Sequence, residues 1–173
     1  MEIRKCTEAD ATAAGAFYDG VVRWLDGHIN YPKWIYGVYP SAETVRASTL
    51  AGEQYICLDN GRIVGAFILN ADPKGNYQKA NWQQPLAEGE YMVLHTLATD
   101  PEVHRRGIGT EIIRYCAGQT RSQGYRALRV DIVPDNWPAR RLYEKNGFTH
   151  AGDEDLERGI DGIPVFSLYE LNW

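Results

Sequence analysis

The sequence lacks the features of several large protein classes. No apolar run approaches the roughly 18 to 20 residues that a membrane-spanning helix needs, and the N-terminal residues Met1 to Lys5 have no signal-peptide core. There is no basic excess: the formal net charge is −5, whereas a general nucleic-acid-binding domain carries a basic face. We therefore expect a cytoplasmic protein with neither a membrane nor a nucleic-acid partner.

Cysteine is also scarce. Cys6, Cys57 and Cys116 lie far apart, are odd in number and form no Cys-x-x-Cys pair. This spacing indicates neither a disulfide framework nor a zinc site, so we expect no metal. We interpret all three as small core residues.

What the sequence does contain is typical of one globular domain, residues 1–173, with 44% hydrophobic and 24% charged residues. Residue patterns predict α/β structure with a mixed, twisted sheet, in which a strand–helix–strand unit makes a parallel pair. Residues 28–40 and 72–89 have no clean periodicity and are predicted to be long loops. The expected strands are 3–5, 54–58, 62–70, 90–99, 126–133, 148–157 and 160–171, and the expected helices start at Thr7, Ser41, Gly107 and Asn136.

The stretch from Leu97 to Cys116 predicts a strand that leaves through a short turn into an amphipathic helix. Gly107 and Gly109 stand where the helix begins, so the backbone there can approach a ligand closely. The unpaired amides and the positive end of the helix dipole favour an anion, and Arg105 and Arg106 add two positive charges. We interpret this stretch as a pyrophosphate site; the alternative is a surface helix with solvated arginines.

Spacing separates the kinds of phosphate site. The chain has no Gly-x-x-x-x-Gly-Lys-Ser/Thr run, and Ile112 stands where a dinucleotide fingerprint needs its third glycine. Residues 104–109 instead resemble the coenzyme A loop of the GNAT superfamily of N-acetyltransferases from Gly107 onward, with His104 where that pattern has Gln or Arg. Residues 136–148, with Asn136, Ala139, Leu-Tyr-Glu-Lys and Gly-Phe, resemble a second signature of the same superfamily.

The resemblance implies a sheet of about six to seven strands flanked by about four helices, and transfer of an acetyl group from acetyl-CoA to an amine by direct attack in a ternary complex. It also implies that Tyr143 faces the thioester sulfur and that Asn136 hydrogen-bonds the coenzyme arm. Their alternatives are a core ring and a helix cap. The implied coenzyme-binding residues are Leu97, Ala98, Thr99, Arg105, Arg106, Gly107, Ile108, Gly109, Thr110, Asn136 and Tyr143.

The implied chemistry needs a base, because an alkylammonium with a pKa of about 10 is mostly protonated at neutral pH. Glu90 and His95 lie on the strand that runs to the glycine turn, and Asp131 lies on its parallel neighbour; a water relay is equally compatible. The backbone N–H of Leu97 would stabilise the oxyanion. Tyr143 would donate a proton to the departing thiolate.

The two loops concentrate aromatic rings, which are typical of small-ligand pockets and can also hold a cationic amine. We predict that they bind a small-molecule amine through Tyr31, Trp34, Tyr36 and Trp82. The same rings could instead cap the end of the sheet or form a homodimer interface. Two rival functions are open at this point: a catalytically silent acyl-CoA-binding sensor or scaffold, and a nucleotide-binding protein of unrelated fold.

Overall fold

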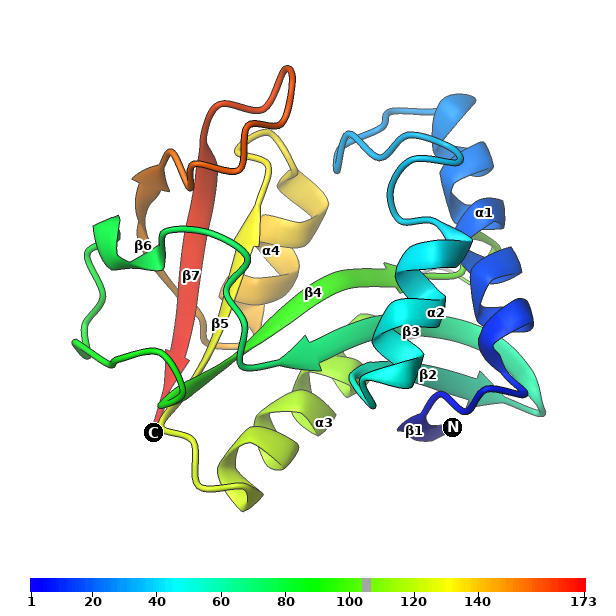
Figure 1. Cartoon of the computed structure of the whole chain (residues 1–173), viewed down its shortest axis with the longest axis horizontal. Coiled ribbons are helices and arrows are strands. Elements are labelled where there is room, and N and C mark those ends of the chain that lie inside the picture. Colours follow the sequence, from blue (N-terminus) through cyan, green and yellow to red (C-terminus); the bar gives the residue numbers. More distant parts are fainter. Residues whose placement is uncertain (104–106) are drawn as a thin grey trace. The chain divides into compact units, whose positions relative to one another are not determined.

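The computed structural model describes residues 1–103 and 107–173 (Figure 1). In chain order its elements are β1 (Glu2–Lys5), α1 (Ala11–Asp26), α2 (Ala42–Leu50), β2 (Gln54–Asp59), β3 (Arg62–Asn70), the 3-10 turn η1 (Tyr77–Lys79), β4 (Tyr91–Thr99), the 3-10 turn η2 (Pro101–Val103), α3 (Ile108–Ser122), β5 (Ala127–Ile132), α4 (Trp137–Lys145), β6 (Thr149–Glu154) and β7 (Phe166–Asn172).

The seven strands follow the order β1-β2-β3-β4-β5-β7-β6. β1, β2 and β3 pair antiparallel, as do β5, β7 and β6. β4 and β5 pair in parallel, with Tyr91–Val93 opposite Ala127–Arg129. Within the described residues, this mixed sheet with its four α-helices confirms the predicted fold class.

The chain forms two compact units. We call Met1–Leu69 with His95–Tyr115 the first unit, and Asn70–Leu94 with Cys116–Trp173 the second unit. β4 and α3 each continue from one unit into the other along the sequence.

In the first unit, the buried stripe of α1 packs into a core with residues of α2 and the sheet, including Tyr18, Val45, Ile56 and Ala98. The Asn60-Gly61 turn has positive φ at both residues and joins Asp59 to its partner Arg62, so the strands expected over 54–58 and 62–70 form a two-residue hairpin. Ser41 caps α2 as predicted, its Oγ accepting from the Thr44 amide at 3.3 Å.

The predicted start of α1 at Thr7 is wrong, since the helix begins at Ala11 after Asp10. The Asp10 carboxylate does not cap the helix. It turns back to accept from the Thr7 hydroxyl at 2.6 Å and from Arg4 Nη1 at 2.6 Å. The same carboxylate accepts from the Thr7 amide at 2.9 Å, and the Asp10 amide donates to Thr7 O at 3.0 Å, so Thr7–Asp10 forms a turn before the helix.

In the second unit, residues 72–89 form the predicted long loop, which contains only η1 and contributes side chains to the core. Tyr77 and Leu86 are buried beside Tyr91 and Leu168, and η1 lies beside β6, where Asn81 N–H donates to Ala151 O at 2.7 Å (Figure 1).

This packing covers both faces of β5, although polar and apolar residues alternate along that strand and alternation usually marks one solvated face. Arg129 is only 1% exposed. Its guanidinium lies 3.9 Å from the centre of the Trp82 ring and 4.1 Å from that of Tyr91, and it donates to Gln84 O at 2.8 Å. The buried cation thus joins the loop to the strand.

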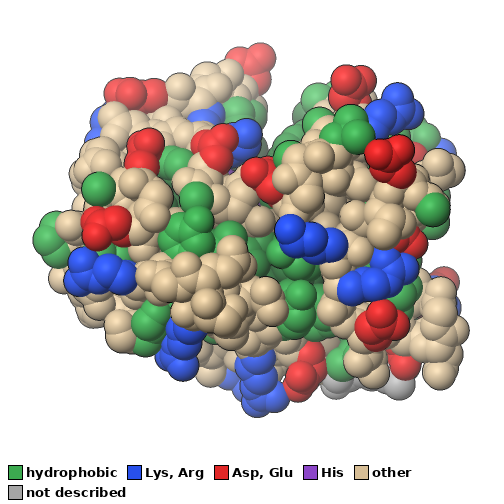
Figure 2. All heavy atoms as spheres, turned by 60° about the horizontal axis from the view of Figure 1, so that its bottom comes forward, with side chains coloured by type: hydrophobic (Ala, Val, Ile, Leu, Met, Phe, Trp, Pro, Cys, Tyr) green, Lys and Arg blue, Asp and Glu red, His purple; other side chains and the backbone are tan. Residues whose placement is uncertain are grey.

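The described part of the chain has no helix long and apolar enough to cross a membrane. On the face drawn in Figure 2, lysine and arginine side chains are interspersed with aspartate and glutamate side chains.

Candidate functional site

The last part of β4, His95–Thr99, lies in the first unit and contains a local backbone irregularity. Thr96 has a φ of 49°, in the left-handed region that a β-branched residue rarely adopts. The buried Tyr18 hydroxyl of α1 donates to the Thr96 carbonyl oxygen at 3.0 Å. Burial raises the pKa of Tyr18, so the phenol keeps the proton that this bond needs. Helix α1 therefore holds the backbone immediately before Leu97.

The predicted glycine turn is present at the head of α3. Gly107 has a φ of 76°, and no described atom outside its own neighbourhood lies within 4 Å of where its Cβ would be. Near the start of the helix, Glu111 N–H donates to Gly107 O at 3.0 Å. The amides that open a helix generally have no acceptor within it, so those of Ile108 and Gly109 and the dipole of a 15-residue helix suit an anion. His104, Arg105 and Arg106 lie outside the described residues.

Asn136 and Tyr143 lie in the second unit. Asn136 is the N-cap of α4, and its side-chain oxygen accepts from the Ala139 amide at 3.3 Å. The helix-cap role is thus present, while its contact with the coenzyme stays a prediction.

Tyr143 projects from α4 and is 4% exposed, with its ring 5.2 Å from that of Phe148. Burial is the main cause that raises the pKa of its phenol, and the nearby Cys116 and Asp131 raise it further. Among the residues that the structure describes, the hydroxyl makes no hydrogen bond. A core ring with its hydroxyl fixed to the backbone is therefore not what is found; the phenol is protonated at neutral pH and can donate.

The candidate bases differ in their surroundings. Glu90 precedes β4, where it accepts from the Ala87 amide at 2.8 Å and lies 3.5 Å from Arg126 Nη1. The pairing of Tyr91 with Ala127 places Glu90 at the start of the parallel pair, about 16 Å along the strands from Asp131. This position gives Glu90 a structural role at the entry to the strand. His95 lies half-buried within β4, and its role as base stays a prediction.

Asp131 is unsuited to the role of base because both of its oxygens are engaged. It is 8% exposed, forms two hydrogen bonds with the Arg158 guanidinium, and accepts from the Tyr77 hydroxyl at 2.5 Å.

The predicted acceptor rings have different environments. In the first unit, Trp34 packs against the core, with its ring T-shaped to that of Tyr18 at 6.3 Å between centroids. Tyr36 is 44% exposed, and the centre of its ring lies 4.5 Å from the Arg23 guanidinium. Tyr31 is half-buried. In the second unit, the Trp82 indole donates to Tyr77 O at 2.6 Å and covers Arg129. Trp34 and Trp82 thus have packing roles, and acceptor binding by these four residues stays a prediction.

Sequence reasoning missed Tyr18, Arg129 and Arg158. Tyr18 has a weak signal, because it shares the helical face of Val21, Val22 and Leu25, which are buried with it. The two arginines have none, since a charged residue in a strand or loop is normally solvated.

The sequence model of the acetyltransferase (GNAT) family matches residues 21–148. The chain belongs to this family. Over 105 residues, or 60% of its length, it is 29% identical to the mycothiol acetyltransferase of Geodermatophilus obscurus. It spans about a third of the length of the curated relatives it matches, 31% in that case and 38% in another.

Solved structures described as acetyltransferases share the fold. A GNAT-family acetyltransferase of Streptococcus agalactiae superposes with a TM-score of 0.77 at 15% identity, covering 99% of this chain and 95% of that one. The protein yncA of Salmonella typhimurium, determined with its cofactor acetyl-CoA, superposes with a TM-score of 0.68 at 18% identity, covering 99% and 93%.

Proposed function

We propose that this chain transfers an acetyl group from acetyl-CoA to the amine of a small molecule by direct attack in a ternary complex. The observation that carries the proposal is the buried Tyr143 phenol of the second unit, which is held protonated and is not committed to any described hydrogen-bond partner. Because the chain belongs to the acetyltransferase family, we assign this phenol the role of proton donor in acetyl transfer.

Acetyl-CoA would bind through the head of α3. Gly107 leaves room for the pyrophosphate, and the amides of Ile108 and Gly109 lie at the positive end of the helix dipole. Leu97, Ala98 and Thr99 would pair with the pantetheine arm through their backbone groups. The donors are all backbone or side-chain groups of this chain, and the proposal needs no metal.

In the proposed reaction, His95 or a water molecule takes a proton from the alkylammonium. The free amine attacks the thioester carbonyl, and the Leu97 N–H, placed just after the irregular Thr96, donates to the oxyanion. The carbon–sulfur bond then breaks. The attacking nitrogen loses its second proton to solvent as this bond breaks. Tyr143 gives its hydroxyl proton to the departing thiolate and regains one from solvent. His95 or the water releases the proton that it took, so each acetyl transfer releases one proton net.

The acceptor would be a small amine with an apolar or aromatic group. Its supporting observation is the exposed loop of the first unit, where Tyr36 and its neighbours Ile35, Val38 and Tyr39 are each at least 44% exposed. Rings in such a loop can contact both an apolar group and a cation.

The test measures acetyl-CoA turnover with 2-phenylethylamine, tryptamine, hexylamine and a short peptide. Tyr143→Phe should lower kcat by about 10²-fold to 10⁴-fold, the usual range for a positioned proton donor, with an unchanged acetyl-CoA Kd. Tyr125→Phe, in the same unit, is the matched control and should keep the wild-type rate. A Tyr143→Phe variant with wild-type kcat would refute the role of general acid.

Coenzyme binding has its own test by calorimetry. Gly109→Glu should abolish acetyl-CoA binding because the carboxylate occupies the place of the phosphates. Gly118→Glu adds the same charge to α3 at an open, exposed position and should leave Kd unchanged. Tight acetyl-CoA binding by the wild-type protein without turnover of any amine would favour the silent sensor or scaffold instead.

A further inference from the structure

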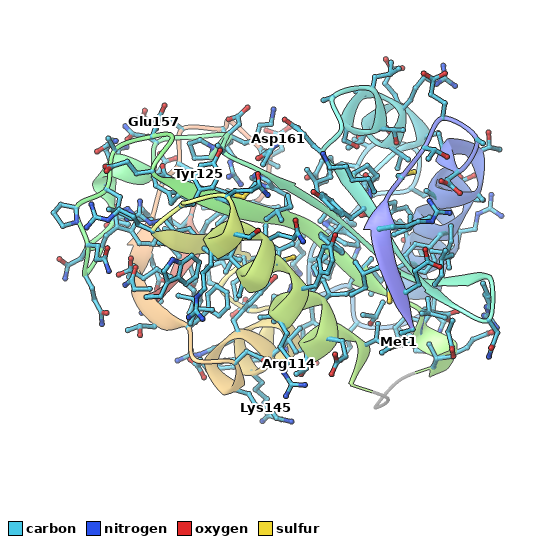
Figure 3. All side chains as sticks on the ribbon, turned by 90° about the horizontal axis from the view of Figure 1, so that it is seen from below. Met1, Arg114, Tyr125, Lys145, Glu157 and Asp161 are labelled. Atoms are coloured by element: carbon cyan, nitrogen blue, oxygen red, sulfur yellow. The ribbon has the colours of Figure 1, made fainter. Side chains whose placement is uncertain are left out.

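The peptide group between Thr96 and Leu97 is held by helix α1, the blue helix of Figure 3, within the first unit. The Tyr18 hydroxyl donates to the Thr96 carbonyl oxygen at 3.0 Å and lies 3.3 Å from Thr96 Oγ1. Tyr18 is only 1% exposed, so its hydroxyl is shielded from water. One buried phenol thus contacts both the backbone and the side chain of Thr96.

The carbonyl that Tyr18 binds belongs to the same peptide group as the N–H of Leu97. This peptide bond is trans, and in a planar trans peptide the carbonyl and the N–H point in opposite directions. A hydrogen bond to the carbonyl oxygen therefore fixes the direction of the Leu97 N–H, which points away from the Tyr18 hydroxyl. The same bond polarises the peptide group, so the N–H becomes a stronger donor.

The left-handed φ of Thr96, 49°, makes such support necessary. A β-branched residue is strained in that region and keeps the conformation only where its surroundings hold it. The Tyr18 hydroxyl holds it through two contacts. Without this hydroxyl, we expect the backbone at Thr96 to relax toward an ordinary extended conformation, which would turn the Leu97 N–H to another direction.

Tyr18 is itself contacted by residues 28–40, the loop between α1 and α2 that we call the acceptor loop. The ring of Trp34 in this loop is T-shaped to that of Tyr18, with 6.3 Å between the two centroids. The Asn30 side chain holds the Trp34 backbone at two points: its Nδ2 donates to Trp34 O at 2.7 Å, and its Oδ1 accepts from Trp34 N–H at 3.1 Å. The order of the acceptor loop is therefore connected to the peptide group after Thr96 through Trp34 and Tyr18.

We propose that Tyr18 is a positioning residue for the acetyl transfer: its hydroxyl orients and strengthens the Leu97 N–H as oxyanion donor, and its ring links that donor to the acceptor loop. The proposal rests on the proposed function, because it acts through the Leu97 N–H. It goes beyond that function by making the oxyanion donor depend on a side chain of another element, and by connecting the order of the acceptor loop to the chemical step.

A merely structural hydrogen bond would affect stability without affecting the chemical step, so the test reads both the peptide group and the reaction. The ¹⁵N chemical shift of the Leu97 amide reports the peptide group, because it responds to a hydrogen bond on the preceding carbonyl. Turnover of acetyl-CoA with 2-phenylethylamine reports the reaction, as kcat and KM separately.

The variants are Tyr18→Phe, which removes only the hydroxyl, and Asn30→Ala, which releases Trp34 without touching Tyr18. The matched control is Tyr77→Phe in the second unit. Tyr77 is also 1% exposed and its hydroxyl also donates to a protein oxygen, so this variant removes a buried hydrogen bond far along the chain from Leu97.

We expect Tyr18→Phe to shift the Leu97 signal and to lower kcat by about 10-fold to 100-fold, less than the loss of about 10²-fold to 10³-fold on removing an oxyanion donor itself. The acetyl-CoA Kd and the KM of the amine should not change, because the oxyanion forms only in the transition state. Asn30→Ala should shift the Leu97 signal in the same direction by a smaller amount, lower kcat by less, and raise the KM of the amine. Tyr77→Phe should keep both kcat and the Leu97 signal.

A Tyr18→Phe variant with wild-type kcat would overturn the proposal and leave only a structural hydrogen bond. An equal loss of kcat in Tyr77→Phe would also overturn it, because lower stability would then account for the loss. An unchanged Leu97 signal in Asn30→Ala would overturn the link to the acceptor loop. Absence of turnover by the wild-type protein would overturn the proposed function and this proposal together, so the two failures are distinguishable.

Discussion

Replacing Gly65 with alanine tests how closely α3 packs on the sheet of the first unit. A Cβ at Gly65 would lie 2.8 Å from Ile112 Cδ1, 3.3 Å from Ala98 O and 3.3 Å from Cys57 Cβ. Ile112 is fully buried. Either its side chain must leave its rotamer or the helix must move away from β3, because the Ala98 carbonyl is backbone and cannot turn aside.

Two effects oppose each other in the free energy of unfolding. Overpacking of a buried site costs about 1–3 kcal/mol. The φ of Gly65 is not in the left-handed region, so alanine can adopt this backbone conformation. Alanine also restricts the unfolded chain, and this effect offsets about 0.4–1 kcal/mol of the overpacking cost. We therefore expect Gly65→Ala to lower the free energy of unfolding by about 1–2 kcal/mol, measured by urea denaturation with an unchanged m-value.

A double-mutant cycle identifies the contact. Ile112→Val removes the Cδ1 methyl group and should cost about 0.5–1.5 kcal/mol in the wild type, but less in the Gly65→Ala background, where it relieves the clash. Additive costs would refute the reasoning, because they would mean that the methyl group and the new Cβ do not meet. Because the glycine turn begins α3, Gly65→Ala should also weaken acetyl-CoA binding, and Ile112→Val should partly restore it.

Two other predictions concern the first unit. Tyr18→Phe leaves the Thr96 carbonyl without its hydroxyl donor. It should therefore lower the free energy of unfolding by about 1–2 kcal/mol, measured by urea denaturation, and it should lower kcat. An unchanged kcat would show that the Thr96 backbone does not affect the reaction. The hydrogen bond from Arg4 is the main cause that lowers the pKa of Asp10. Asp10 therefore stabilises the fold above its unfolded pKa of about 4, and this contribution is lost as pH falls below that value. Asp10→Asn should flatten the pH dependence of Tm below pH 4, and an equally steep dependence would contradict this assignment.

Local chemistry made part of this fold predictable. The Asn60-Gly61 hairpin and the Ser41 cap follow from residue types that suit one backbone conformation almost irrespective of their surroundings. The turn at Gly107 before α3 follows for the same reason. The start of α1 shows the limit of such signals: Asp10 is a good cap residue, but its carboxylate binds Arg4 and Thr7 instead of the first amides of the helix.

Long-range burial was not predictable. Polar residues alternate along β5, and alternation is the usual sign of a solvated face. Arg129 is nevertheless buried and the Asp131 side chain is only 8% exposed, because Trp82 and Tyr77 of the loop before β4 contact them. That loop in turn has no periodicity of its own, since its order comes from contacts with residues more than forty positions away.

These two charged residues of β5 therefore change how the aromatic loop of the second unit should be understood. Rings that form a ligand pocket would be free to contact the ligand. Here Trp82 instead covers the buried Arg129 guanidinium, and Tyr77 donates a hydrogen bond to the Asp131 carboxylate. Removing either ring would open one side of a buried charge to water. Trp82→Ala should thus affect folding before it affects any acceptor, whereas the exposed Tyr36 is the predicted acceptor residue whose replacement tests recognition without disturbing a core.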